Sequence, residues 1–311
     1  MLPSSPDCAR VAMSKPYGPA WKWLAVVLVL VTAAGTIFCG PTQTSQKMRV
    51  VASVFPLADM VRNVGGNLVE VTTLLPPGVD IHTYEPTPNK IKDLARAKLF
   101  VEVGAGLEYW AEDIVKSSGN KDIVFVDTSK GVSLLQEVGE GRANPHFWLD
   151  VTIAMKQVQD IRDALVQVDP NNKVVYERNT AIYLVELKQL EQWIADSVRE
   201  FSRKDFASVH PTWDYFARRY GLNQMAVIEK YQSAEPSPAY IKSVVDAVKT
   251  VGVKVIFAEV QFNPQAAQAI ADETGAQVLF LDPQGGETIP GRDSYINMMK
   301  GNVNQMALAL K

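Results

Sequence analysis

The sequence predicts an α/β protein with two Rossmann-like lobes, whose parallel sheets are flanked by helices and joined by one long helix. Three observations predict this fold. Short β-branched runs alternate with helical segments from residue 48 onward. After Pro170 a helical pattern continues without glycine or proline as far as residue 210. Strands and helices then alternate again. Such alternation is typical of a mostly parallel sheet with helices on its faces.

The composition excludes several classes of protein. The chain has 311 residues, and its 31 Lys and Arg are balanced by 34 Asp and Glu. A nucleic-acid protein normally carries a basic face, so we expect no nucleic-acid partner. Two cysteines cannot form a disulfide framework. Gly104-Ala105-Gly106 lacks the third glycine of a dinucleotide-binding loop, which argues against a dinucleotide cofactor.

The N-terminus is typical of a signal peptide. Residues 24–38 form an apolar run without charge, preceded by Lys15 and Lys22. A membrane-spanning helix usually needs ~20 apolar residues, so we interpret residues 1–39 as a leader. Cys39 resembles the lipid-attachment cysteine of bacterial lipoproteins, although Phe38 before it is larger than usual at such sites. An uncleaved anchor, a different cleavage point and a start at Met13 are the alternatives. Residues 40–47 form a polar tether.

The first predicted lobe covers residues 48–169. Four strand-like runs are expected here, at residues 48–54, 68–75, 99–103 and 122–126. One helix follows Pro56. Another opens at Thr87-Pro88, because threonine is a good N-cap and proline is favoured at the first helical position.

The linking helix is predicted over residues 170–203. Apolar side chains recur at steps of three and four, which places them on one face of a helix of about 30 residues and about 45 Å. These side chains are Tyr183, Leu187, Leu190, Ile194, Val198 and Phe201. A helix of this length favours a connection between two lobes. The alternative is a surface helix packed on one lobe.

The second predicted lobe covers residues 204–311. Strands are expected at residues 206–209, 253–258 and 277–281. Helices are expected at residues 214–219, 240–249 and 265–273. The first of these helices is expected to stop at Gly221 and the third at Gly275, as helix C-termini often do.

The three histidines of the chain suggest a metal site. His82, His146 and His210 all lie in loops between a strand and a helix, and Asp282 directly follows the strand at residues 277–281. Open α/β sheets bind ligands beyond the carboxyl ends of their strands. Three imidazoles and one carboxylate fill a tetrahedral zinc shell. The alternative is that each histidine is an ordinary hydrogen-bonded or exposed side chain.

Longer motifs around these residues carry a resemblance to a known family. They are DIHTYEPTPNKIKDLARAKLFVEVGAGLE at residues 80–108, NPHFWLD at 144–150, SVHPTWDYFARRYGL at 208–222, EPSP at 235–238 and FLDPQGG at 280–286. Over residues 48–311 the chain resembles the zinc- and manganese-binding receptors of bacterial ABC importers, the cluster A-I metal-binding proteins. The resemblance implies that His82, His146, His210 and Asp282 are the four metal ligands. It places them in the cleft between the lobes.

The resemblance also implies a function. We expect a monomeric extracytoplasmic receptor, not an enzyme, which delivers a divalent metal ion to an ABC permease and is held at the membrane surface through Cys39. A histidine at the third ligand position favours Zn²⁺, with Mn²⁺ as the second candidate. Residues 117–142 lack the His-rich loop of many zinc receptors, which leaves the metal open. Glu259 is an alternative carboxylate, although a structural role suits it better.

Two other classes of protein remain as rival interpretations. A zinc hydrolase needs an open coordination position and a general base, whereas the chain has no H-E-x-x-H motif and Asp282 would close the fourth position. A surface adhesin is suggested only by the reputation of the family. For a receptor, imidazoles must be neutral to bind metal, so we expect the affinity to fall as the pH drops through about 6.5.

Overall fold

The computed structural model describes residues 47–137, 141–229 and 237–311. Residues 47–311 form one compact unit. The leader predicted for residues 1–39, with its Cys39, lies outside the described residues. Within the described parts of the chain, no helix is both long and apolar enough to cross a membrane.

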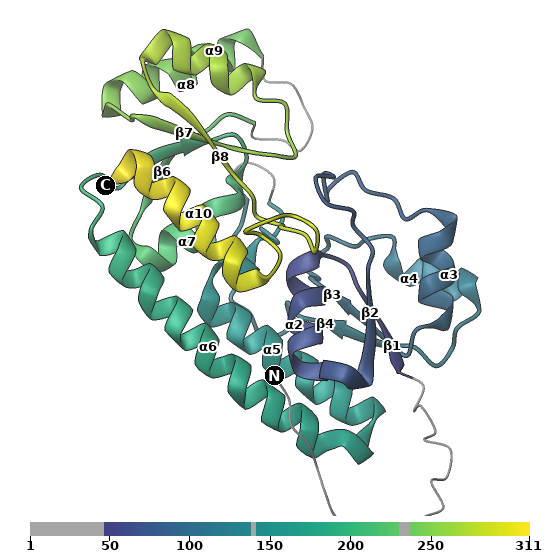
Figure 1. Ribbon diagram of the computed structural model, residues 1–311. Helices are drawn as coiled ribbons and strands as arrows, with labels where there is room; N and C mark the ends of the chain where they lie inside the picture. The colour runs from purple at the N-terminus through teal and green to yellow at the C-terminus, as the bar shows by residue number, and fades with distance from the viewer. Residues whose placement is uncertain (1–46, 138–140, 230–236) are drawn as a thin grey trace, which may run out of the picture. The chain divides into compact units, whose positions relative to one another are not determined.

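The N-terminal lobe is built on a four-stranded parallel sheet. Its strands have the order β2-β1-β3-β4, so the order in which successive strands are added to the sheet reverses between β1 and β3 (Figure 1). The elements of this lobe are β1 (Met48–Ala52), α2 (Phe55–Gly65), β2 (Val69–Thr73), α3 (Pro88–Arg96), β3 (Leu99–Glu102), α4 (Ala111–Ser118), β4 (Val124–Asp127) and α5 (Val151–Val168).

The C-terminal lobe has a second parallel sheet with the corresponding order β6-β5-β7-β8. Its elements are β5 (Asp205–Ser208), α7 (Asp214–Tyr220), β6 (Asn223–Val227), α8 (Pro238–Val251), β7 (Val255–Glu259), α9 (Gln265–Thr274), β8 (Gln277–Leu281) and α10 (Tyr295–Leu310). In a sheet of this kind, ligands bind at the carboxyl ends of the strands.

Side chains alternate between two cores in each sheet. In β1, Val50 packs into the main core and Val51 faces the smaller core under α3 and α4. In β7, Phe257 faces the main core and Ile256 faces a separate core under α8 and α9. This alternation follows from the two-residue period of a strand. One face of each sheet therefore contributes to the same main core.

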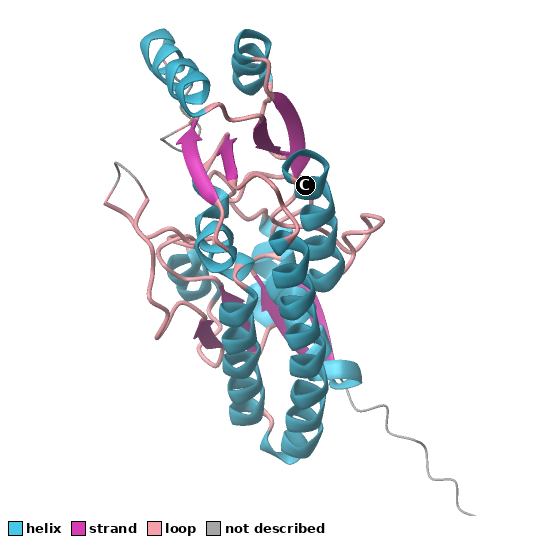
Figure 2. Ribbon diagram, turned by 90° about the vertical axis from the view of Figure 1, so that its left-hand side faces the viewer, coloured by secondary structure: helices cyan, strands magenta, loops and turns pink. Residues whose placement is uncertain are grey.

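The long helix is confirmed as α6 (Lys173–Arg199), which follows a short 3-10 turn at Pro170–Asn172. Its buried face includes Tyr183, Leu187 and Leu190, as the periodicity predicts. It runs beside α5 and α2 of the N-terminal lobe and also packs on α10 of the C-terminal lobe (Figures 1 and 2). The fold class predicted from the sequence, two parallel-sheet lobes with a connecting helix, is confirmed.

Direct hydrogen bonds also join the lobes. The indole Nε1 of Trp148 donates to the carbonyl of Pro283 at 2.8 Å, and the Tyr295 hydroxyl donates to the carbonyl of Trp148 at 2.7 Å. The backbone N–H of Tyr295 donates to Asp59 Oδ2 at 3.0 Å. All of these side chains are buried. The loops that follow the strands of the two sheets are thereby held against each other.

Candidate metal centre

His82 lies in the loop that follows β2. Its backbone N–H donates to Asp80 Oδ1 at 2.9 Å, which shapes the turn that carries the imidazole. The side chain is partly buried. Burial lowers the pKa of His82 to about 4, with the opposing effect of Asp80 and a smaller lowering effect of the positive charge of Arg142 included. At neutral pH this imidazole is uncharged.

His146 lies just before α5, where a short 3-10 turn covers Phe147–Leu149. It is 3% exposed. Its backbone N–H and its ring Nδ1 both lie 2.9 Å from Asn144 Oδ1. The ring centroid of Trp148 lies 5.4 Å from that of the His146 imidazole, so the indole covers one side of this ring. Burial, reinforced by His82 and His210, lowers the pKa of His146 well below its ordinary value.

His210 follows β5 after one residue and precedes Pro211. The Ser208 hydroxyl donates to the His210 carbonyl at 2.8 Å, and the Phe262 ring lies 5.4 Å from the imidazole. The residue is 2% exposed. Burial lowers the pKa of His210 well below its ordinary value, with a further contribution from His82.

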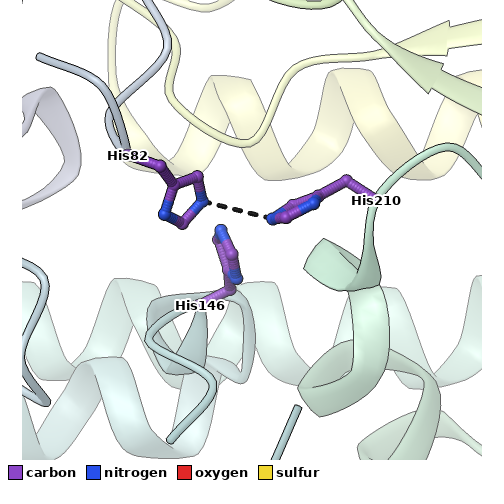
Figure 3. A group of neighbouring side chains, drawn as sticks. All are labelled: His82, His146 and His210. Atoms are coloured by element: carbon purple, nitrogen blue, oxygen red, sulfur yellow. Dashed lines mark hydrogen bonds between the residues drawn. The ribbon is translucent and has the colours of Figure 1, made fainter. Parts of the chain in front are cut away.

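The three imidazoles converge. One ligand atom of each lies within 4.8 Å of the others, and Nε2 of His82 is 3.2 Å from Nε2 of His210. Figure 3 shows the His146 ring pointing at the gap between the other two rings. Zinc–nitrogen bonds of about 2.0–2.1 Å with tetrahedral angles place two ligand nitrogens about 3.3 Å apart. The spacing of these two nitrogens thus suits one tetrahedral metal ion.

Asp282 is placed differently. It directly follows β8 and is 2% exposed, but no atom of it belongs to the group of converging ligand atoms. Its Oδ1 accepts hydrogen bonds from three donors at 3.0 Å, namely the backbone N–H groups of Gln284 and Gly285 and the side-chain amide of Gln261. Its Oδ2 accepts one from Arg292 at 2.9 Å. The Asp282 carboxylate is therefore held by Arg292 and by the turn at Gln284 and Gly285.

Glu259 also lies outside the group of converging ligand atoms. It ends β7 and is fully buried, and its Oε1 accepts a hydrogen bond from Trp213 Nε1 at 3.2 Å. Burial raises the pKa of Glu259 to about 8, against the lowering effect of a hydrogen bond from Thr212. At neutral pH the carboxyl group is therefore mostly protonated. Its contacts fix the turn that follows His210.

A cavity of about 310 Å³ leads to His82, the most exposed of the three histidines. Tyr109, Arg142 and Pro145 are among its lining residues. A metal ion needs a path from solvent to its ligands. This cavity reaches one of the three histidines from the side of the N-terminal lobe.

Two residues with clear roles in this geometry escaped sequence reasoning. Asn144 contacts His146 and also the chain after His210, and Arg292 pairs with Asp282. Asn144 stands in the NPHFWLD motif, which was the only signal available. Nothing in the sequence marks Arg292, because the glycine-containing turn that brings it to Asp282 has no helical or strand periodicity.

The chain is similar to known metal-transport proteins over most of its length. Residues 50–309 match the family described as zinc-uptake complex component A, periplasmic. The manganese-binding lipoprotein MntA of Halalkalibacterium halodurans is 30% identical over 292 residues, which cover 92% of this chain and 96% of that protein. The high-affinity zinc uptake system protein ZnuA of Bacillus subtilis is 28% identical over 308 residues, covering 92% and 97%.

A solved structure agrees with these sequence relationships. A crystal structure of ZnuA superposes with a TM-score of 0.78 and 32% sequence identity, covering 85% of this chain and 99% of that chain. The relatives are substrate-binding receptors, and this chain is likewise a receptor and not an enzyme. Because the family match spans most of the sequence, the chain belongs to the zinc-uptake component A family, the cluster A-I metal-binding receptors of ABC importers.

Proposed function

We propose that this chain is an extracytoplasmic receptor that captures Zn²⁺ at His82, His146 and His210 and delivers it to the permease of an ABC importer. The observation that carries the proposal is the convergence of three imidazoles within 4.8 Å. Burial keeps them uncharged, so their lone pairs are available to a cation. Three imidazoles favour Zn²⁺ over the harder Mn²⁺. Mn²⁺ is the second candidate, since one relative is named for manganese.

We also propose Asp282 as the fourth ligand, through Oδ2. Among the described residues, Oδ1 accepts three hydrogen bonds and Oδ2 accepts only the one from Arg292. A carboxylate oxygen has two lone pairs, so Oδ2 keeps one for a metal ion. Ligation by Oδ2 leaves the bonds to Oδ1 in place. The Arg292 side chain is 35% exposed, which gives it room to move aside.

The family match supports the proposed location and partner. The family is described as periplasmic, and one relative is named a lipoprotein. We propose attachment to the membrane surface through Cys39 and action as a monomer. In this arrangement the receptor stays near its permease after each delivery.

Calorimetric titration of the metal-free, full-length chain in detergent tests the proposal. We expect one Zn²⁺ per chain. His210→Ala removes a ligand and should weaken binding by on the order of 100-fold or more. Asn120→Ala is the matched control, because this side chain bonds the carbonyls of Leu94 and Ala97, away from the histidines. The control should bind Zn²⁺ as the wild type does.

Competition between Zn²⁺ and Mn²⁺ on the same protein decides the metal. We expect Zn²⁺ to displace Mn²⁺. The reverse order would identify a manganese receptor at the same site. Absence of tight binding by either ion, or unchanged binding in His210→Ala, would refute the site itself.

A further inference from the structure

The Asn144 side chain lies between the segments that carry two of the histidines. Its Oδ1 is 2.9 Å from both the backbone nitrogen and the ring Nδ1 of His146. Its Nδ2 donates to the carbonyl of Pro211 at 2.7 Å and to Asp214 Oδ2 at 3.2 Å. Asn144 is fully buried. One amide group thus contacts His146 of the N-terminal lobe and the residue after His210 of the C-terminal lobe.

The orientation of this amide follows from its backbone partners. The N–H of His146 can only donate, and the carbonyl of Pro211 can only accept. The oxygen of Asn144 must therefore face His146, and its nitrogen must face Pro211. An acceptor at 2.9 Å from Nδ1 of His146 requires a proton on Nδ1. Nε2 is then the nitrogen of His146 that carries the lone pair.

Further contacts fix the same residue from the C-terminal lobe. The Tyr215 hydroxyl donates to the Asn144 carbonyl at 2.9 Å and accepts from the backbone N–H of Leu135 at 2.8 Å. Gln224 Nε2 donates to Asp214 Oδ1 at 2.8 Å, so the carboxylate that meets Asn144 is itself held. Asn144 is consequently bound through both its side chain and its main chain.

We propose that Asn144 is a positioning residue, which selects the tautomer of His146 and fixes its placement relative to the His210 loop. The inference rests on the proposed function, because it assumes that these imidazoles capture a divalent cation. A partner on the second nitrogen of a ligating histidine commonly sets its tautomer and orientation. Here the Asn144 amide also bonds the carbonyl of Pro211, in the loop that carries His210. One side chain thus positions two metal-ligand histidines, one from each lobe.

The first test needs no variant. Nitrogen-15 NMR of histidine-labelled, metal-free, full-length chain at neutral pH reports which nitrogen of each imidazole carries the proton. We expect His146 as the Nδ1–H tautomer. Observation of the Nε2–H tautomer in the wild-type chain would overturn the proposal, whatever the chain binds. The result is independent of metal capture, so it separates this inference from the proposed function.

The second test exchanges the side chains at positions 144 and 214, first one and then both. Asn144→Asp keeps an acceptor for His146 but loses the donor to Pro211 and faces Asp214 with a like charge. We expect it to retain the Nδ1–H tautomer and to bind Zn²⁺ about 10–100-fold more weakly. The double variant Asn144→Asp with Asp214→Asn restores a donor opposite an acceptor at these two positions, but it does not restore the donor to the carbonyl of Pro211. It should therefore recover only part of the lost affinity.

Asn144→Ala removes both the acceptor for His146 and the donor to Pro211. We expect it to lose the Nδ1–H preference of His146 as well as zinc affinity. Asn120→Ala again serves as the control for loss of a partly buried amide that bonds backbone carbonyls, with the tautomer and affinity unchanged. Thermal unfolding of each variant shows whether it folds. A folded Asn144→Asp that binds Zn²⁺ as tightly as the wild type would contradict the coupling of the two ligands. An unchanged tautomer in folded Asn144→Ala would contradict the positioning of His146.

Discussion

At the scale of single residues, burial determines the charge of the histidines. Desolvation disfavours the imidazolium form, and it is the largest cause of the lowered pKa at all three positions. For His82 the pKa falls to about 4. Metal capture at neutral pH therefore requires no net loss of protons from these rings. Their neutrality is part of the folded state.

This neutrality predicts a pH profile for zinc affinity. Three exposed imidazoles with a pKa of about 6.5 would lose on the order of 1000-fold in affinity between pH 7.5 and 5.5, because each would be protonated. For the buried histidines we expect a loss below about tenfold over that range, with the steep fall near pH 4 or lower. Competition with a chelator of known pH dependence measures it. A fall of about 1000-fold by pH 5.5 would contradict the burial argument.

The sequence could nominate the histidines because only three occur, each in a loop between a strand and a helix. It could not supply their partners. The bond between Asn144 and Pro211 joins residues 67 positions apart, and Arg292 meets Asp282 only across an irregular turn. Neither contact has a periodicity. The expected fall of affinity near pH 6.5 also assumed ordinary pKa values, since burial is invisible before folding.

At the scale of elements, α6 stabilises the molecule through one apolar face. Leu187, Leu190 and Ile194 are buried in the main core, whereas Val185 on the same helix is 54% exposed. The helix contains 27 residues, so it spans about 40 Å. Its packing on α2, α5 and α10 links helices of both lobes.

Leu190→Ala should therefore destabilise the whole protein. Removing a buried leucine side chain costs about 2–5 kcal/mol, while Val185→Ala on the exposed face should change the free energy of unfolding by less than about 0.5 kcal/mol. Denaturant unfolding of the metal-free protein measures both. Zinc affinity should stay the same in each, since neither side chain belongs to the histidine group. Equal effects of the two substitutions would be inconsistent with the buried face described here.

Element prediction succeeded where periodicity was strong. The buried strands and α6 lie where the pattern places them. The strand β6 and the helix α10 were not predicted. β6 is an edge strand, mostly exposed or half-buried, and its sequence NQMAV has little β-branched character. α10 contains Gly301 and three asparagines, so packing of residues such as Met298 and Met299 stabilises it more than helix propensity does.

At the scale of the whole molecule, the two sheets share one core. Val50 of β1, Leu190 of α6 and Phe257 of β7 belong to the same buried cluster. The bonds of Trp148 and Tyr295 cross between the lobes beside it. Separation of the lobes by wide hinge bending would expose this core to water, which is unfavourable. Metal capture and release should therefore involve loop changes and small shifts of packed helices.

Distance measurement between spin labels tests this expectation. Labels at Ser117→Cys on α4 and Ala269→Cys on α9, with Cys8 and Cys39 replaced by serine, report on the two lobes from exposed positions. Between the metal-free and zinc-loaded forms we expect a change on the order of 1–2 Å, as for sliding helices. A change on the order of 10 Å would indicate hinge opening instead. A label pair within one lobe, at Ser117 and Lys92, provides the control.

The histidine group also determines when a newly synthesised chain can first bind a metal ion tightly. His82, His146 and His210 come from segments far apart in the sequence and meet only in the folded protein. The unfolded chain offers no assembled site, so it cannot retain a metal ion as the native protein does. A chain exported before it folds first acquires tight metal binding where folding is completed. The metals present in that compartment, rather than those at the place of synthesis, then decide which ion the new receptor meets first.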